Sequence, residues 1–536
     1  MTTEHLEIER KFEAEESFAL PDLAGVGEVA SMGEPQTHEL EATYYDTADL
    51  RLLRSRVTLR RRTGGPDAGW HVKLPAGAGA RRELHQPLGR ASRTVPKAVL
   101  APVLGQLGTA APAPVATLST RRVVHPLLDG EGRVLAEVAE DVVHGTALAA
   151  VPGEPATVTI WREVEVELVD GDAALLDAVT ERLVDAGARV SASPSKVGRV
   201  LDGRLPAPAT APGAGADGGP AGNGKKGKRR EKKGGAGAKA DPASGAGAVV
   251  VAALAGQLTA LRAADLAVRT GQEDGVHDVR VACRRLRSIL AAFRPVLDRE
   301  QTDPLREELR WVGEQLSGAR DGEVALAHLR ALVAEQPPEL VLGPVAARLQ
   351  QTAVSDHEAG ARAVTRALAD RRYLRLLDAL DALLADPPLT AAAGDPAPAV
   401  VADAVRRAGR RLRRAVAAAQ AAEGEEREHA LHAVRKAAKR VRYTAEVAAG
   451  LLGTPAEDLV ADMQRVQDAL GTVQDTVITR AYCTRLGLLA FAAGENAWSF
   501  GRLHGLEEAR AARATDAFWA LEPSLRKAVR AASRAG

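Results

Sequence analysis

The chain has 536 residues, of which 46% are hydrophobic, 26% are charged and only 3% are aromatic. At roughly 100 to 200 residues per domain, this length indicates several domains and excludes a mini-protein held together by disulfides. Lysine and arginine number 71 against 70 aspartate and glutamate residues, which leaves a formal net charge of +1. A basic binding site must therefore be local, because the chain as a whole is not charged like a protein that coats nucleic acid.

The cysteines and the first residues indicate the compartment. Only Cys283 and Cys483 occur, far apart in the sequence, so neither a disulfide framework nor a cysteine metal cluster is expected. The first 13 residues are rich in glutamate and contain no apolar targeting segment, and no apolar stretch is long enough to cross a membrane. We expect a cytoplasmic protein without a membrane partner.

The N-terminal part has the pattern of β-strands. Segments 5–12, 57–62, 70–74, 134–142 and 158–169 alternate apolar and charged residues and are separated by glycine and proline turns. Each segment has one charged face; in the first, Glu7, Glu9 and Lys11 share it. The other charged faces are formed by Arg60 and Arg62, by His71 and Lys73, by Glu137 and Asp141, and by Glu163, Glu165 and Glu167.

A solvated outer face would explain this pattern in any single strand. The same parity in acidic and basic strands favours a sheet that closes with its charged faces inward, around a lumen of both signs. Converging carboxylates favour a hard cation with oxygen ligands, Mg²⁺ or Mn²⁺, and arginine and lysine opposite them favour an anion with several oxygens. A metal-chelated phosphate chain meets both requirements, and the matching chemistry is metal-assisted cleavage of a phosphoanhydride.

In order and spacing, these segments resemble the CYTH family of triphosphate tunnel metalloenzymes. The resemblance covers residues 1–204 and rests on Glu7-Ile8-Glu9-Arg10-Lys11, Tyr44-Tyr45-Asp46-Thr47, Leu59-Arg60-Arg61-Arg62, Trp70-His71-Val72-Lys73-Leu74, Arg82-Glu83, Glu163-Val164-Glu165-Val166-Glu167-Leu168 and Ser195-Lys196. It implies an antiparallel eight-stranded tunnel.

The resemblance also implies the roles of individual residues. The catalytic residues would be Glu7, Glu9, Lys11 and Asp141, and Mg²⁺ or Mn²⁺ would be held by Glu7, Glu9, Glu165 and Glu167. The substrate would be bound by Lys11, Arg60, Arg62, Lys73, Arg82, Arg122 and Lys196. An insertion rich in glycine, alanine and proline precedes the last acidic strand, so the inner acidic pair is either Glu163 with Glu165 or Glu165 with Glu167.

A change of composition separates the two halves of the chain. Residues 205–248 consist mainly of alanine, glycine and proline with a lysine-rich run at 225–233, which predicts a flexible linker because this composition cannot bury a core. From 249 to 530 the apolar residues follow the helical period, interrupted by prolines. We therefore predict a multidomain α+β protein with an all-α C-terminal domain.

The helical half contains a duplication, with repeats at about 249–385 and 398–530. Residues 277–287 read HDVRVACRRLR and residues 432–442 read HAVRKAAKRVR, so the basic residues recur 155 positions apart (277 to 432, 287 to 442). His277, Arg280, Arg284 and Arg287 form one helix stripe, and so do His432, Arg435, Lys439 and Arg442. Packed as a pseudo-twofold pair, the repeats would form a basic groove. Its few aromatics favour a phosphate polymer over stacked bases.

This half resembles the CHAD domain, a helical family that binds inorganic polyphosphate and often follows a CYTH domain. The resemblance assigns polyphosphate binding to His277, Arg280, Arg284, Arg285, Arg287, His357, Arg362, His432, Arg435, Lys439, Arg440, Arg442, Tyr443, His504 and Arg510. A further arginine row has no evident counterpart in the first repeat: Arg406, Arg407, Arg410, Arg411, Arg413 and Arg414. It is either an extra polyanion patch or a solvated helix face.

The sequence as a whole predicts metal-dependent hydrolysis of tripolyphosphate or a related triphosphate, combined with polyphosphate binding and association with polyphosphate granules. Two alternatives stay open: activity like that of a class IV adenylate cyclase, and a polyphosphate tether without catalysis. A nucleic acid is the less favoured partner, and no protein partner is predicted.

Overall fold

The computed structural model describes residues 3–76, 80–89, 94–149, 155–205 and 245–534. The chain forms two compact units, residues 1–211 and 212–536. Most of the predicted linker, residues 206–244, lies outside the described residues, and helix α6 already begins at Ala246, within the last residues assigned to the linker. The domain limits at 204 and 249 remain predictions.

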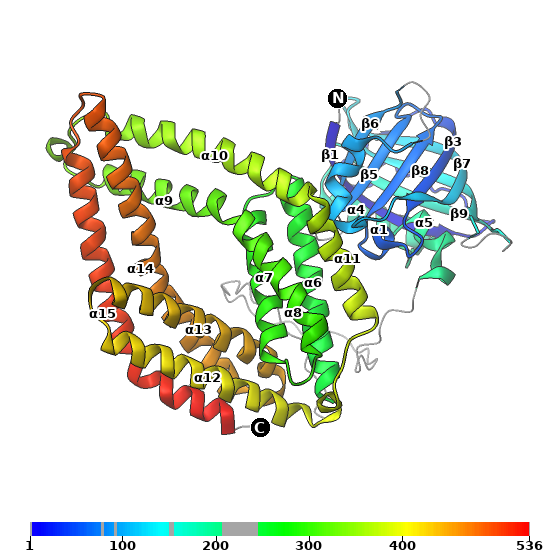
Figure 1. Ribbon diagram of the computed structural model, residues 1–536. Helices are drawn as coiled ribbons and strands as arrows, with labels where there is room; N and C mark the ends of the chain where they lie inside the picture. Colours follow the sequence, from blue (N-terminus) through cyan, green and yellow to red (C-terminus); the bar gives the residue numbers. More distant parts are fainter. Residues whose placement is uncertain (1–2, 77–79, 90–93, 150–154, 206–244, 535–536) are drawn as a thin grey trace, which may run out of the picture. The chain divides into compact units, whose positions relative to one another are not determined.

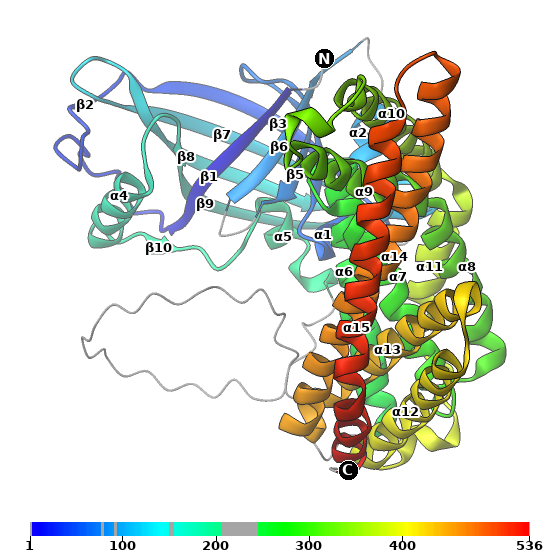
Figure 2. The same cartoon turned by 90° about the vertical axis from the view of Figure 1, so that its left-hand side faces the viewer.

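Eight antiparallel strands of the first unit close into a barrel (Figures 1 and 2). They are β1 (Thr3–Ala14), β3 (Gln36–Asp46), β4 (Thr58–Thr63), β5 (Gly69–Pro75), β6 (Ala80–Pro87), β7 (Ala113–Leu128), β8 (Val134–Ala147) and β9 (Thr157–Leu168). Their order is β1-β6-β5-β4-β3-β7-β8-β9, and pairing of β9 with β1 closes the ring. The predicted eight-stranded antiparallel tunnel is confirmed.

Shorter elements complete this unit. Two-residue strands β2 (Ser31–Met32) and β10 (Arg189–Val190) pair with β7 and β1. The helices are α1 (Arg51–Arg54), α2 (Lys97–Leu100), α3 (Leu104–Leu107), α4 (Ala173–Asp185) and α5 (Lys196–Val200), with 3-10 turns η1 (Ala101–Val103) and η2 (Asp202–Arg204).

Much of the apolar core of this unit lies outside the barrel wall. Phe12 of β1 and Val166 of β9 pack against Val179 and Leu183 of α4, and all four are fully buried. Because side chains alternate across a strand, the charged residues between these apolar ones point into the barrel. The apolar face of these strands therefore points outward and packs under α4, and the charged face points into the lumen.

Helix α5 closes one end of the lumen. Its Val197 and Val200 pack with Trp161 of β9 in a buried cluster. The Ser195 hydroxyl caps the helix by accepting a hydrogen bond from the Gly198 N–H at 3.1 Å. Gly145 of β8 allows this close approach, since a Cβ there would lie 2.4 Å from Val200 Cγ2. The α5 end of the barrel is thus filled by packed side chains.

The second unit is all-helical, as predicted. The first repeat contains α6 (Ala246–Arg269), α7 (Gly275–Ala292), α8 (Arg299–Gln315), α9 (Ser317–Ala334), α10 (Val345–Ala369) and α11 (Arg371–Ala385), with 3-10 turns η3 (Pro338–Leu340) and η4 (Ala391–Gly394) after α9 and α11. The second contains α12 (Ala397–Ala421), α13 (Gly424–Leu452), α14 (Thr454–Ala492) and α15 (Trp498–Arg534).

The repeats share one hydrophobic core, which contains Leu261 and Val279 from the first and Val405 and Val434 from the second. They differ in how their helices are divided. The counterpart of the continuous α14 is broken at Leu316 between α8 and α9, and that of α15 is broken at Asp370 between α10 and α11. The Asp370 carboxylate caps α11 by accepting a hydrogen bond from the Arg372 N–H at 2.8 Å.

Candidate functional sites

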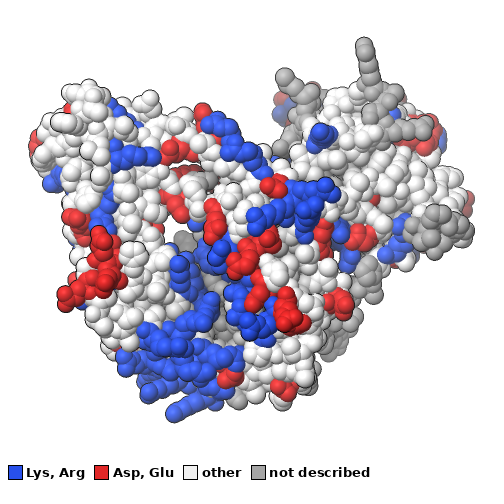
Figure 3. Space-filling model, in the orientation of Figure 1, with Lys and Arg blue, Asp and Glu red and all other residues white. Residues whose placement is uncertain are grey.

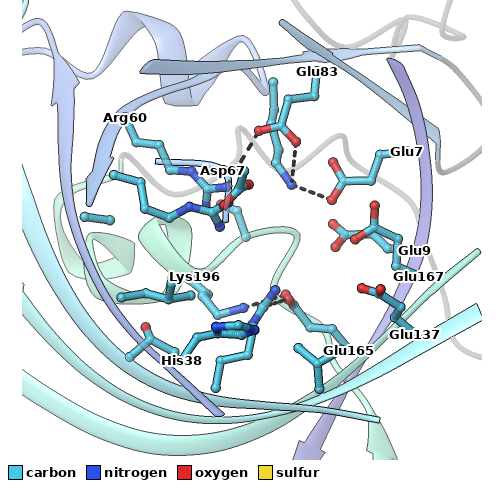
Figure 4. Close-up of a pocket in the computed structure, with 18 of the residues that line it drawn as sticks. Glu7, Glu9, His38, Arg60, Asp67, Glu83, Glu137, Glu165, Glu167 and Lys196 are labelled. Atoms are coloured by element: carbon cyan, nitrogen blue, oxygen red, sulfur yellow. Dashed lines mark hydrogen bonds and ion pairs between the residues drawn. The ribbon is translucent and has the colours of Figure 1, made fainter. Parts of the chain in front are cut away.

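The barrel encloses a cavity of about 370 Å³ lined by both carboxylates and cations. Five acidic side chains come from β1, β8 and β9: Glu7, Glu9, Glu137, Glu165 and Glu167. Two more, Asp67 and the β6 residue Glu83, lie among the cations, where Asp67 pairs with Arg62 and Glu83 lies near Arg60. The cations come from β1, β4, β5, β6 and β7 and from α5: Lys11, Arg60, Arg62, Lys73, Arg81, Arg122 and Lys196. Figure 4 shows Glu7, Glu9, Glu137 and Glu167 on one side of the lumen and Arg60 and Lys196 on the other.

The acidic side is set by strand register. Glu9 of β1 is paired with Glu167 of β9, which is paired in turn with Glu137 of β8. Burial, followed by the charges of Glu7 and its acidic neighbours, raises the pKa of Glu167 to about 7. One oxygen of Glu7, Oε2, is buried and has no hydrogen-bond partner among the described residues. Negative charge on this side exceeds what the nearby cations neutralise.

The opposite wall carries guanidinium groups. Arg60 donates a hydrogen bond to the Tyr44 hydroxyl at 3.4 Å and lies 3.7 Å from the Glu83 carboxylate. Burial and the neighbouring charges of Arg60 and Arg122 lower the pKa of Arg62 to about 9. Crowded guanidinium groups in a low-dielectric lumen are relieved by an anion with several oxygens.

Lys73 and Lys11 connect the two walls. Lys73 contacts Glu7 and lies 3.7 Å from Glu83, while Lys11 lies 2.7 Å from Glu9 and also contacts Glu165. Burial opposes the ionisation of Glu165, but Lys11, Lys196 and Arg122 override it and hold its pKa well below the usual range. Glu165 is therefore an ionised carboxylate that cations already neutralise.

A second acidic cluster lies beside α5. Asp141, Glu163 and Glu165 each offer an oxygen within 4.8 Å of the others, which is close enough to hold a metal ion. The Lys196 ammonium lies among them, at 2.9 Å from Asp141, 2.6 Å from Glu163 and 2.6 Å from Glu165. Arg122 also donates two hydrogen bonds to Asp141, at 2.8 and 2.7 Å. This cluster anchors cations that point at the lumen.

The structure brings most of the predicted tunnel residues together. Glu7, Glu9, Lys11, Arg60, Arg62, Lys73, Arg122, Glu165, Glu167 and Lys196 all line the cavity. Glu165 and Glu167 are the acidic pair that faces it, whereas Glu163 pairs with Lys196. Asp141 does not line the main cavity and acts on it through Arg122 and Lys196.

Arg82 requires a correction, because it does not line the cavity, whereas its neighbours Arg81 and Glu83 do. Side chains alternate along β6, so a strand that points Glu83 inward points Arg82 outward. The assignments from sequence also missed Glu83, which binds His71 at 2.6 Å and lies near Arg60 and Lys73. The shared parity of Arg81 and Glu83 was the signal that could have found them.

The helical unit contains a basic groove between its repeats. A cavity of about 290 Å³ is lined by Arg284, Arg287, Ser288, Arg306, His432, Arg435, Lys436, Lys439 and Arg440, which come from α7, α8 and α13. Burial and the charges of Arg284 and Arg435 lower the pKa of Lys439 to about 6. Arg306 comes from a third helix, so the repeat pattern could not predict it. Lys436 lies one turn after His432 and shares its helix face.

The other predicted groove residues lie outside this cavity. Arg280 pairs with Asp321 at 2.8 Å, and Arg285 and Arg442 flank the Tyr443 ring and each lie 3.3 Å from Glu446. His277 and His357 are exposed. Arg362 pairs with Glu358, His504 with Glu508 and Arg510 with Glu507. Among the described residues, α10 and α15 therefore contribute no lining residue to this cavity, and the assignment of their basic residues to polyphosphate binding stays a prediction.

Comparison with known proteins agrees with this architecture. Family models for the CYTH domain and the CHAD domain match residues 5–197 and 252–484. The chain belongs to these families and consists of a CYTH domain followed by a CHAD domain. CYTH domains are metal-dependent triphosphate tunnel enzymes, which include triphosphatases and cyclases.

The chain is also similar along its length to two curated proteins of Mycobacterium tuberculosis. These are the uncharacterized protein Rv2226 of strain H37Rv and the uncharacterized protein MT2285 of strain CDC 1551. Each is 36% identical over 538 residues, which cover 98% of this chain and 98% of the relative.

Several solved structures are similar to parts of the chain. PptA from Streptomyces chartreusis is 21% identical with a TM-score of 0.45, over 52% of this chain and 100% of that one. The CHAD domain from the plant Ricinus communis is 24% identical with a TM-score of 0.43, over 54% and 93%. HpAC1 from Hippeastrum, described with a dominant triphosphatase activity, is 14% identical with a TM-score of 0.22, over 38% and 97%.

Among the described residues, one helix is long and apolar enough to span a membrane by length and composition alone. It is α6, whose Val250, Leu254 and Leu261 lie in the core that the two repeats share. A buried core helix of a helical bundle passes the same test, so α6 is weak evidence for a membrane segment.

Proposed function

We propose that the barrel hydrolyses the terminal phosphoanhydride of tripolyphosphate or a related triphosphate, and that the helical unit binds inorganic polyphosphate. The observation that carries the proposal is the lumen itself, in which an acidic side with excess negative charge faces a wall of buried cations. A chelated triphosphate is the simplest ligand that satisfies both walls at once.

The acidic side fits a divalent metal ion better than the cluster beside α5 does. Lys196, Arg122 and Lys11 together already pair with Asp141, Glu163 and Glu165. Glu7, by contrast, keeps a buried oxygen without a hydrogen-bond partner among the described residues, and Glu167 resists ionisation among like charges. We therefore assign Glu7, Glu9 and Glu167 as the residues that would hold Mg²⁺ or Mn²⁺, with Glu165 at the edge of the set. When bound, the metal would polarise a phosphoryl oxygen and lower the pKa of a bound water.

The protein's own side chains would bind and orient the phosphates. Arg60, Arg62 and Arg122 supply planar groups that suit bidentate contacts to phosphate oxygens, and Lys73 and Lys196 supply mobile point charges. Each lysine already contacts a carboxylate, so substrate binding would exchange these ion pairs for contacts to phosphate. Charge that develops on the leaving diphosphate would then meet preplaced cations.

The groove supports the second half of the proposal. It gathers arginines, lysines and one histidine from three helices, and no carboxylate and no Phe, Tyr or Trp lines it among the described residues. Burial and the charges of Arg284 and Arg435 lower the pKa of Lys439, and a bound anion would favour its charged form. Both cysteines are buried and free, which fits the cytoplasmic location that we propose, in association with polyphosphate granules.

The test is phosphate release by the full chain with Mg²⁺ or Mn²⁺, from tripolyphosphate, ATP and long-chain polyphosphate in parallel. We expect metal-dependent release from tripolyphosphate that is lost in Glu9→Gln and Glu165→Gln. Glu39→Gln is the matched control, because Glu39 is an exposed carboxylate on β3 that does not line the cavity.

Other outcomes would identify the alternatives. Formation of cyclic AMP and diphosphate from ATP would indicate a cyclase. No release from any substrate, combined with polyphosphate binding that survives Glu9→Gln and fails in Arg284→Ala, would show a tether without catalysis and overturn the enzyme assignment.

A further inference from the structure

The helical unit has a second basic cavity, on α12. It has a volume of about 270 Å³ and is lined by Arg407, Arg410, Arg411, Arg414 and Arg440, over a floor of small side chains: Ala291, Ala292, Ala404 and Ala408. Figure 3 shows that lysine and arginine side chains gather over this part of the molecule, where α12 and α13 lie. The sequence left open whether this row is a polyanion patch or a solvated face.

The arginines of this cavity are poorly neutralised. Residues 407, 410, 411 and 414 follow the i, i+3, i+4, i+7 spacing of one helix face. Asp403 pairs with Arg406 and Arg407, but Arg410, Arg411 and Arg414 form no ion pair among the described residues. Burial and the charge of Arg410 lower the pKa of Arg407. Like charges held this close favour an anion in the cavity.

The fold itself does not require this row. The buried face of α12 matches that of α6 at a separation of 151 positions: Val250, Leu254 and Leu261 correspond to Val401, Val405 and Leu412 (250 to 401, 254 to 405, 261 to 412). At the same separation, Arg410, Arg411 and Arg414 correspond to Thr259, Ala260 and Ala263. The first repeat packs its equivalent helix without these arginines, so they are not a packing requirement of the fold.

The cavity adjoins the groove. Arg440 of α13 lines both of them, so an anion that leaves the groove past Lys439 and Arg440 next meets the α12 arginines. No Phe, Tyr or Trp lines either cavity among the described residues, so bases would lack the large stacking platforms typical of nucleic-acid binders. A bare phosphate chain fits this path better than a nucleic acid does.

We propose that the α12 arginine cavity is a second phosphate subsite that binds a further stretch of a polyphosphate chain already held in the groove, and so gives the protein preference for long chains. This inference rests on the proposed polyphosphate binding. The floor of small residues lets the chain lie close to the helix, and four guanidinium groups from one face plus Arg440 supply the donors.

The test measures the affinity of the full chain for polyphosphates of graded length, at several salt concentrations. In the triple variant Arg410→Ala, Arg411→Ala, Arg414→Ala we expect long-chain affinity to fall by about tenfold or more and short-chain affinity to stay within about twofold. The slope of log affinity against log salt should decrease by about two for long chains, at roughly 0.7 per lost contact to a single-stranded polyanion. A triple change to lysine should retain most of the affinity.

A matched control removes the same charge elsewhere. Arg366→Ala, Arg371→Ala, Arg375→Ala changes three exposed arginines of α10 and α11, and its affinities should equal those of the unchanged chain. Equal losses in both triples, or equal losses for short and long chains, would overturn the subsite. If the unchanged chain binds no polyphosphate, the proposed function fails; if single-stranded RNA competes as well as long polyphosphate, the ligand is a nucleic acid instead.

Discussion

At the scale of single residues, two glutamates of β9 have different roles because strand pairing places them beside different neighbours. Glu163 and Glu167 of β9 both point inward, but Glu163 binds Lys196 at 2.6 Å, whereas Glu167 lies with Glu7 and Glu9 on the side short of cations. Loss of a metal ligand should weaken metal binding by more than the roughly 10- to 100-fold cost of losing a hydrogen-bond partner of a ligand. Glu163 is neither of these in the assigned metal set, because it pairs with Lys196.

We therefore expect Glu167→Gln to raise the Mg²⁺ concentration for half-maximal activity by roughly 100-fold or more. In Glu163→Gln that concentration should change by less than about tenfold, while KM for the triphosphate rises because Lys196 loses an anchor. Metal titrations of both variants at saturating substrate make this comparison. The reverse ranking would place the metal in the cluster beside α5.

The lowered pKa of Lys439 predicts that polyphosphate binding depends on pH. Burial and the charges of Arg284, Arg435 and Arg442 on α7 and α13 lower its pKa to about 6 in the free protein, and a bound phosphate raises it again. Between these two values the complex holds one more proton than the free protein. The affinity for polyphosphate is therefore highest below about pH 6. It falls as the pH rises above this value, by up to about tenfold per pH unit.

Binding titrations between pH 5.5 and 8.5, at roughly half-unit steps, would measure this effect. Lys439→Arg should flatten the profile and keep the affinity, because arginine stays charged throughout. Lys527→Arg, at an exposed site on α15, should leave the profile unchanged. His432, which also lines the groove, contributes any slope that remains in Lys439→Arg. A steep profile in the double variant Lys439→Arg, His432→Asn would contradict the prediction.

At the scale of elements, the five-residue helix α5 places Lys196 in the lumen and depends on Gly145 of β8 for its position. A methyl group at 145 would lie 2.4 Å from Val200 Cγ2 and 3.1 Å from the Trp161 ring, so Gly145→Ala should displace α5. We expect kcat/KM for the triphosphate to fall between about tenfold and 100-fold through misplacement of Lys196.

Val200→Ala removes the obstructing carbon, so Gly145→Ala, Val200→Ala should recover much of the activity that the single variant loses. Steady-state kinetics together with a thermal melt separate this effect from unfolding. If the double variant is no more active than Gly145→Ala, then the position of α5 is not the cause of the loss.

At the scale of the whole molecule, the proposed function combines in one chain a tunnel that would take phosphate ends and a groove that would hold phosphate polymers. Holding a long chain in the groove raises the concentration of its ends near the tunnel, whereas tripolyphosphate gains nothing from the groove. In the full chain, Arg284→Ala with Lys439→Ala should slow phosphate release from long polyphosphate at low substrate concentration and leave release from tripolyphosphate unchanged. Unchanged release from both substrates would show that the two units act independently, and an equal loss on both would show that the substitutions disturb the tunnel itself.

Individual residues show which features of the two sites could be predicted from the sequence. The alternation of Glu7, Glu9 and Lys11 with Leu6, Ile8 and Phe12 predicted an inward charged face only together with the same parity in the other charged strands. Arg82 was assigned from the family resemblance, whereas parity with Glu83 would have indicated Arg81 instead. In the helical half, the duplicated stripe predicted Arg284, His432, Arg435 and Lys439 in one groove.

The sequence by itself determined the two architectures, the duplication and the charge of each strand and helix face, since these follow from periodicities of 2 and 3.6 residues. The tertiary structure decided which charged faces meet. Strand register placed Glu167 beside Glu9 and left Glu163 with Lys196, and helix packing brought Arg306 into the groove while Arg362 and Arg510 stayed outside. The reason is physical: periodicity is local, whereas a binding site depends on contacts between elements distant in the chain.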